Sequence, residues 1–440
     1  MMYTIVQIPK KFLFTVFLLM LFTCLFGIHT SSAFFQDKTQ DYSQYKGKVL
    51  DAKSKKPLIF ASLSVEGSNI STISNTEGEF SLKVPVSIVN TNISISFLGY
   101  QTKLIPLSQF KTGKNKIFMN VSVTALPEVN VQIPKDALSL VQETLKRKGE
   151  NYFDNPTLMT AFYRETIRKR KKNVSLSEAV VNIYKTPYSS LRKDALQLYK
   201  ARKSTDYSRL DTIALKLQGG PFNALYVDIM KYPEYIFTEE TLDAYVFSFD
   251  RSARVNDRLI YVVNFEQQDY LTDPLYKGKL YIDAENKILT SAIFSLNITD
   301  KDKASKLFVR KKPKNVKVWP TEVAYRVDYR EKNGKWYYSY SNVLLEFKVN
   351  WSKKLFNSVY SMTCEMAITD WKKNTTGKFP KLKERIKSSI ILSNEDIGFA
   401  DPDFWGEYNI IEPEKSIESA IKKIQRQLRR SKAREGTSIP

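Results

Sequence analysis

Cysteine and histidine are nearly absent from this chain of 440 residues, which contains two cysteines and one histidine. Cys24 and His29 both lie in the first 33 residues, which have the features of a secretory signal: Lys10-Lys11, an apolar run over 12–28, and small residues at the end. Cleavage there leaves Cys364 alone and no histidine. This excludes an internal disulfide framework, catalysis by Ser-His-Asp or Cys-His groups and histidine-containing zinc sites.

Long apolar runs are also lacking, because no second stretch of 18 or more apolar residues follows the signal over residues 1–33. A helix needs about 20 such residues to cross a bilayer. We therefore expect a mature chain without a spanning helix, exported to the periplasm or associated with the outer membrane.

Acidic residues are few relative to basic ones: 46 Asp and Glu stand against 68 Lys and Arg, a net charge of +22. This balance favours anionic partners such as lipid headgroups or acidic polysaccharide over nucleic acid. The alternative is that scattered lysines only keep the protein soluble. No cofactor and no metal ion are expected.

Short alternating strands broken by turn residues fill residues 45–123. Ile93-Ser-Ile-Ser-Phe97 has an apolar residue at every second position, and Asn75-Thr-Glu-Gly78 carries residues that tolerate a positive φ angle. The first pattern predicts a strand with one core face, and the second predicts a tight turn. Together they predict an N-terminal β-sandwich.

The order of Gly47–Asp51, the turn Asn75–Gly78 and Phe97-Leu-Gly-Tyr100 resembles the carboxypeptidase-regulatory-like domain. That family is a transthyretin-like β-sandwich found at the front of many Bacteroidetes envelope proteins. The resemblance implies a fold and a rigid spacer or docking role, but no chemistry. Without histidine, the domain is not accompanied by the zinc peptidase that the family name suggests.

A proline-bounded linker is predicted over 124–135, followed by a β-rich antiparallel domain over 136–440. Asp136 is predicted to cap a short helix, and Asn333-Gly334 is the strongest hairpin signal in the chain. Cys364 is expected to be a small core residue. The segment Lys-Gly-Lys-Leu-Tyr-Ile-Asp283, with the return strand that follows it, resembles the hairpins of periplasmic lipoprotein-carrier-like sheets, whose concave face holds lipid. The predicted fold class is thus mainly β, with a few helices.

Arg164, Glu165 and Glu178 are expected on two neighbouring strands and are candidates to face one another. Two buried carboxylates can perform acid–base chemistry, whereas an Arg–Glu pair only ties strands together. The second interpretation is the commoner outcome and is preferred.

Four carboxylates alternate with aromatic residues between Asp401 and Glu412, a pattern that suits a calcium or sugar site. The acids lack the spacing of a calcium loop, so a loop held on the sheet by its aromatics is preferred. The candidate binding residues in this segment are Asp401, Asp403, Trp405, Glu407 and Tyr408.

A final helix is predicted over 413–432, with acidic residues early and basic residues late, as the helix dipole favours. Its basic end is a candidate contact for an anionic membrane surface, and docking on the sheet is the alternative. The candidate contact residues are Arg426, Arg429, Arg430 and Lys432.

These features predict an exported, non-catalytic envelope protein that binds or docks an envelope protein, a glycan or an anionic lipid. One alternative is a glycoside hydrolase using two carboxylates, since that chemistry needs no histidine. A lipid-binding carrier is the other.

Overall fold

The computed structural model describes residues 41–122, 124–125, 136–170, 172–205, 218–250, 253–255, 258–309, 312, 314–352, 355–394 and 404–414. The predicted signal, most of the predicted linker and nearly all of the predicted final helix lie outside this set. Within it, no helix combines the length and hydrophobicity needed to span a bilayer.

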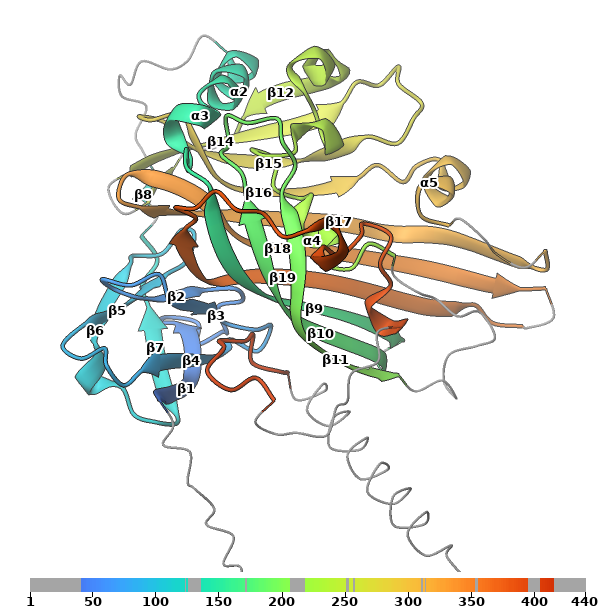
Figure 1. The fold of residues 1–440 in the computed structure, drawn as a ribbon. Helices are drawn as coiled ribbons and strands as arrows, with labels where there is room; N and C mark the ends of the chain where they lie inside the picture. Colours follow the sequence, from blue (N-terminus) through green and yellow to red (C-terminus); the bar gives the residue numbers. More distant parts are fainter. Residues whose placement is uncertain are drawn as a thin grey trace, which may run out of the picture. The chain divides into compact units, whose positions relative to one another are not determined.

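The N-terminal part is a β-sandwich of two small sheets, ordered β4-β1-β7 and β3-β2-β5-β6 (Figure 1). Its strands are β1 (Tyr42–Asp51), β2 (Ser62–Val65), β3 (Ser71–Ile73), β4 (Glu79–Pro85), β5 (Asn92–Ser96), β6 (Lys103–Pro106) and β7 (Asn115–Met119), with the short helix η1 (Leu107–Gln109) before β7.

Alternation along β2 and β5 gives the second sheet two different faces. Leu63 and Val65 on β2 pack with Ile93 and Ile95 on β5 in the sandwich core. The serines between them point to the other face, because side chains alternate across a strand. The predicted turn is also confirmed: the Gly78 amide donates to the Asn75 carbonyl at 2.9 Å, with φ of 72° at Gly78.

The rest of the strands form one 12-stranded sheet in the order β11-β10-β9-β19-β18-β17-β16-β15-β14-β13-β8, with β12 paired to β14. Its pairings are antiparallel, and the strands at its two ends run in clearly different directions in Figure 1, as sheet twist requires. The strands are β8 (Thr124–Ala125), β9 (Thr157–Lys169), β10 (Lys172–Lys185), β11 (Ala195–Thr205), β12 (Tyr245–Phe249), β13 (Ala253–Val255), β14 (Arg258–Gln267), β15 (Tyr276–Asp283), β16 (Ile288–Leu296), β17 (Val316–Lys332), β18 (Lys335–Trp351) and β19 (Ser358–Lys373).

Helices are few and short, so the mainly β fold class is confirmed. They are α2 (Ala137–Lys146), α3 (Lys148–Asn151), α4 (Phe222–Leu225), α5 (Lys301–Phe308), η2 (Pro233–Tyr235), η3 (Glu239–Ala244), η4 (Leu382–Glu384) and η5 (Leu392–Asn394). Asp136 caps α2 as predicted, since its carboxylate accepts from the Ser139 amide at 2.6 Å. Cys364 is buried in the main core.

The long sheet has two differently covered faces. One face, here called the inner face, carries the main core and is covered by α2 and by residues 218–244. The other, the outer face, carries a small aromatic cluster that includes Phe162, Tyr340 and Trp405 and that also contains Ile73 of the sandwich. The Ser71 hydroxyl of β3 donates to the Ile368 carbonyl of β19 at 3.0 Å, which fixes the sandwich directly on this face.

Candidate functional site

The residues singled out in the 401–412 segment do not assemble into a site in the described part of the chain. Asp401 and Asp403 lie outside the described residues, and Glu407 is exposed. Trp405 is buried against Phe162, with ring centroids 5.4 Å apart, and Tyr408 lies against Tyr199. The aromatics therefore hold this segment on the sheet, which is the interpretation preferred from the sequence.

The same segment joins the sandwich to the long sheet. Asn409 exchanges two hydrogen bonds with the backbone of Lys83 on β4, at 2.7 and 3.0 Å. On the sheet side, the Arg164 guanidinium donates to the Ile411 carbonyl at 2.7 Å. Residues 404–414 are thus a structural strap between the two parts.

Arg164 and Glu178 pair across β9 and β10 at 2.7 Å, both fully buried, and Arg202 binds the other Glu178 oxygen at 2.6 Å. Burial alone would raise the pKa of Glu178, but the two arginines lower it below its usual value. Glu165 lies on the opposite face and accepts from Tyr163 at 2.9 Å. Glu165 and Glu178 therefore do not form a carboxylate pair.

The predicted contacts Arg426, Arg429, Arg430 and Lys432 lie outside the described residues. Among the residues that are described, no group of three or more His, Cys, Asp or Glu side chains could hold a metal ion.

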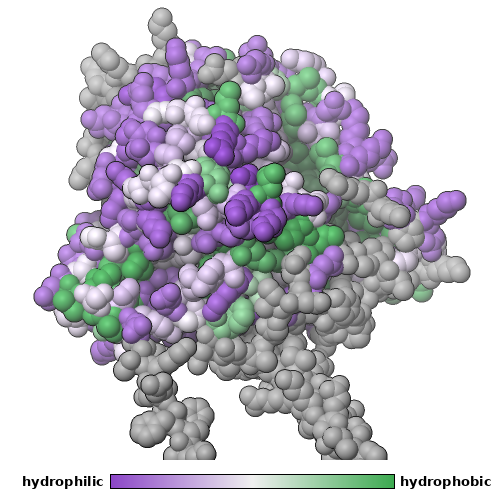
Figure 2. Space-filling view, viewed as in Figure 1, coloured by the Kyte–Doolittle hydropathy of each residue, from purple (hydrophilic) through white to green (hydrophobic). Residues whose placement is uncertain are grey.

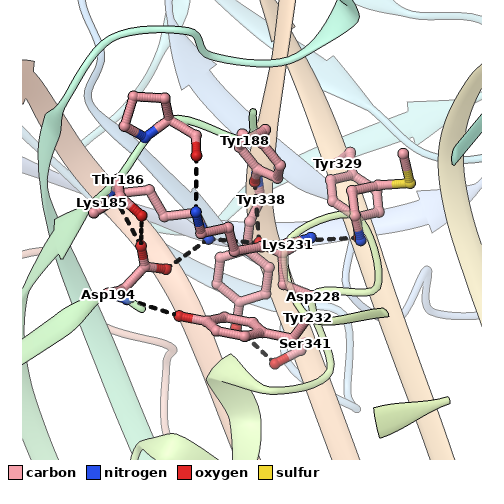
Figure 3. A network of polar contacts seen from close by, with 12 residues as sticks. Lys185, Thr186, Tyr188, Asp194, Asp228, Lys231, Tyr232, Tyr329, Tyr338 and Ser341 are labelled. Atoms are coloured by element: carbon pink, nitrogen blue, oxygen red, sulfur yellow. Dashed lines mark hydrogen bonds and ion pairs between the residues drawn. The ribbon is translucent and has the colours of Figure 1, made fainter. Parts of the chain in front are cut away.

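A buried polar network occupies the inner face, drawn in Figure 3. Lys185, at the end of β10, donates to Asp194 at 2.9 Å and to Asp228 at 2.6 Å. Tyr188 and Tyr329 also donate to Asp228, at 3.1 and 2.9 Å. Burial would lower the pKa of Lys185, but the two carboxylates outweigh it and raise this pKa above its usual value.

This network closes on itself and leaves its central groups without access to a ligand. Lys185, Asp194 and Asp228 have side-chain exposures of 1% or less. Asp228 belongs to the segment that covers the inner face, so the network fastens that segment to β10 and β17. Sequence analysis missed it, because Tyr188, Asp194 and Asp228 lie in the stretch 186–250, which shows no clear periodicity, and their partners Lys185 and Tyr329 lie outside that stretch.

An open cleft of about 470 Å³ lies on the outer face, between the sandwich and the long sheet. The sandwich side presents the serine face of β2 and β5. Two cross-strand pairs form it, Ser62 opposite Ser96 and Ser64 opposite Ser94. The Ser62 hydroxyl is buried and has no hydrogen-bond partner among the described residues.

The sheet side of the cleft supplies charge and aromatic surface. Arg326 of β17 binds Asp328 at 2.8 Å, and its guanidinium lies 5.6 and 5.9 Å from the ring centres of Phe60 and Phe97 on the sandwich. Burial lowers the pKa of Arg326, but the contact with Asp328 raises it above its usual value. This guanidinium is therefore a fixed cation in the cleft wall.

A second arginine repeats the arrangement farther along the cleft. Arg258 of β14 binds Glu331 at 2.6 Å and lies 5.7 Å from the ring centre of Trp336. The cleft thus combines hydroxyls, paired arginines and carboxylates, and aromatic rings. Its volume falls within the range of about 300–1,000 Å³ that is typical of ligand sites.

Comparison with protein families identifies the sandwich. The family model described as CarboxypepD_reg-like domain matches residues 45–133. The sandwich is a CarboxypepD_reg-like domain. This confirms the resemblance seen in the sequence for about a fifth of the chain. The serine face of the cleft therefore belongs to the CarboxypepD_reg-like domain, and the arginine face belongs to the long sheet.

No curated protein matches the chain. Among solved structures, a DUF1329 family protein from Desulfovibrio piger is similar over 55% of this chain and 94% of its own, at 9% identity and a TM-score of 0.23. A LolA superfamily protein from Nitrosomonas europaea is similar over 57% and 98%, at 10% identity and a TM-score of 0.20. Lipovitellin is similar over 50% and 26%, at 7% identity and a TM-score of 0.22.

Proposed function

We propose that this is an exported, non-enzymatic envelope protein that binds a glycan in the cleft between the CarboxypepD_reg-like domain and the long sheet. The observation that supports this most is the composition of the cleft walls. A serine face lies opposite arginines and aromatic rings across about 470 Å³ of open volume.

A glycan suits these walls because of its own chemistry. Its many hydroxyls both donate and accept hydrogen bonds, as serine hydroxyls do, and arginine and carboxylate groups complement them. Ser64 and Ser94 line the cleft, and their hydroxyls can both donate to and accept from a ligand hydroxyl. Phe97 and Trp336 offer flat apolar surface to the C–H face of a sugar ring.

A binding role is preferred to hydrolysis on the same geometry. Asp328 and Glu331, two acids of the cleft, are each hydrogen-bonded to an arginine. A lipid carrier is disfavoured because the inner face of the sheet is filled by α2, by residues 218–244 and by the charged network of Lys185.

The test is binding of the chain without residues 1–33 to a panel of envelope glycans, including peptidoglycan fragments and acidic polysaccharides, by isothermal titration calorimetry. The substitution Ser64→Phe should fill the cleft and reduce affinity for the bound glycan by at least about tenfold. Ser87→Phe is the matched control, because Ser87 is an exposed serine of the same domain that lies outside the cleft. Unchanged glycan affinity of the Ser64→Phe variant would exclude the cleft as the binding site. Release of shortened glycan products would contradict a non-enzymatic role.

A further inference from the structure

Three of the longest strands end together at one end of the sheet, beyond the edge of β16. β16 pairs only with residues 324–328 of β17, so β17 continues past it toward Val316. There Val316 lies opposite Trp351 of β18, and the turn from β18 leads into β19. The turn between β9 and β10 joins this end, because the Arg170 amide donates to the Val359 carbonyl of β19 at 2.8 Å. Figure 1 shows the ends of β17, β18 and β19 at the right.

Basic residues dominate this end of the sheet. The sequence segments 166–177, 309–321 and 347–364 contain five, five and three Lys or Arg residues, and no Asp or Glu. Arg168 among them is paired with Glu414 of the strap. Six basic side chains here are exposed in the structure: Arg170, Lys172, Lys312, Lys314, Lys317 and Lys348.

Two large apolar side chains stand at the outermost turn, between β18 and β19. Leu355 is 97% exposed and Phe356 is 78% exposed. They directly follow Lys353 and Lys354 in the sequence. We call Leu355, Phe356 and the six exposed basic residues the basic tip. Two adjacent exposed apolar side chains form a larger apolar surface than a single one, and exposed apolar surface rimmed by polar residues marks interaction sites.

Lys348 is only two residues from Glu346, but the outer end of the basic tip lies farther from the acids of these strands. Glu322 and Glu346 lie opposite each other on β17 and β18. Glu346 is five residues before Trp351, about 17 Å at the rise of a strand. The Debye length is about 8 Å at physiological salt. An approaching surface therefore meets positive charge at the tip.

A hollow of about 360 Å³ extends this surface along the outer face. Lys277, Lys301 and Lys348 line it together with Asn297 and Thr299, and no Asp or Glu is among its lining residues. Lys348 belongs both to the hollow and to the basic tip. Anionic groups of headgroup size can therefore be bound beside the tip as well as at it.

We propose that the basic tip docks the protein on an anionic lipid bilayer, with Leu355 and Phe356 inserted among the lipids and the lysines on the headgroups. Charge alone would suit any polyanion. An exposed Leu-Phe pair at the extreme end of a basic surface suits a bilayer, because peripheral proteins combine buried apolar side chains with lysines at the headgroup level. Figure 2 shows hydrophilic residues over much of the visible face, with hydrophobic groups between them.

This docking is separate from glycan binding in the cleft, since the eight residues of the basic tip are not among the cleft residues. The two proposals can therefore fail independently.

The test is flotation of the chain without residues 1–33 with vesicles of phosphatidylcholine, with or without phosphatidylglycerol. We expect binding to the anionic vesicles that is at least about tenfold tighter than to neutral ones and that weakens as salt rises. Leu355→Ser with Phe356→Ser should weaken binding by about tenfold or more. Leu191→Ser with Leu382→Ser is the matched control, because these leucines are 96% and 81% exposed and lie outside the tip.

The charge contribution is tested by Lys312→Gln, Lys314→Gln and Lys317→Gln together, which should also reduce binding by about tenfold or more. The comparison arm is the variant with Arg426→Gln, Arg429→Gln, Arg430→Gln and Lys432→Gln, and its vesicle binding should be retained. The proposal is overturned if the comparison arm alone abolishes binding, if the Leu-Phe variant binds like the parent, or if soluble polyphosphate binds while vesicles do not. An unchanged free energy of unfolding in urea shows that the tip variants are folded.

Discussion

The network of Lys185 and the cleft of Arg326 use the same kinds of residue on opposite faces of one sheet. Each has a cation beside aromatic rings, held by two carboxylates at Lys185 and by one at Arg326. Lys185 is sealed by residues 218–244 and its hydrogen bonds are completed within the chain, whereas Arg326 faces an open volume with a hydroxyl near it that is unpaired among the described residues. The comparison of the two regions shows that residue type alone does not mark a binding site. What distinguishes the two regions is whether the protein completes its own hydrogen bonds.

The largest loss of stability should come from breaking the buried network of Lys185. Lys185→Ala leaves Asp194 and Asp228 buried without their cation, and removing one partner of a buried pair costs about 3–5 kcal/mol. We expect the free energy of unfolding in urea to fall by that amount. Lys279→Ala is the control, because the Lys279–Asp250 pair is on the surface and such pairs contribute less than about 1 kcal/mol. Equal losses in both variants would mean that the network is not the fastening of residues 218–244.

A second test of the inner face uses the ionisation of the Glu165 carboxyl. Burial raises the pKa of this carboxyl to about 7, from a usual value of 4.5. The folded state therefore keeps a proton that the unfolded chain releases, and stability is lost as the pH rises from about 4.5 to 7. The total loss is about 3 kcal/mol, since one pKa unit corresponds to about 1.4 kcal/mol.

Glu165→Gln cannot ionise, so it should remove this loss. The free energy of unfolding of the variant minus that of the parent should increase by about 3 kcal/mol between about pH 4.5 and pH 8, measured by urea titration at each pH. Glu266→Gln, which removes an exposed carboxylate on β14, is the matched control. A difference that does not change with pH would contradict a buried, protonated Glu165.

The hairpin of β17 and β18 supplies residues to both regions, and a single turn sets its register. Asn333 and Gly334 have φ of 52° and 75°, as the predicted turn requires. Gly334→Ala meets no atom within 4 Å, so only the backbone conformation opposes it. We expect a loss of about 1–2 kcal/mol in thermal or urea unfolding. Gly113→Ala, at a glycine that is also open but lacks a positive φ, should cost less, and the reverse order would contradict this account.

The same hairpin shows where sequence analysis succeeds and where it stops. Local patterns predicted the turn at Asn333-Gly334, the cap at Asp136 and the alternation of Ile93 and Ile95, because each is decided within a few residues. A β-bulge places Asp328 opposite Tyr340 but Tyr329 opposite Tyr338. Tyr338 consequently faces the inner core while Tyr340 faces the outer cluster, a change of face that strict alternation does not predict.

The candidate sites were less predictable than the fold, for a related reason. Lys185, Asp194 and Asp228 are brought together only by tertiary packing, and no spacing in the sequence marks them. The cleft combines β2 and β5 with β14 and β17, which are far apart in the chain. The alternation of serines on β5 was visible, but its significance depends on which surface lies opposite.

The smallest effect on stability should come from substitutions in the cleft. Ser64→Ala and Ser94→Ala remove hydroxyls that face the cleft from a cross-strand pair, and their backbone pairing is unaffected. We expect the free energy of unfolding of the double variant to stay within about 0.5 kcal/mol of the parent, as at surface positions away from special features. The same variant should bind the glycan more weakly, because lost ligand hydrogen bonds are not compensated. A double variant that unfolds as readily as Lys185→Ala would show that the serine face is part of the closed structure, and the contrast between the two faces of the sheet would then disappear.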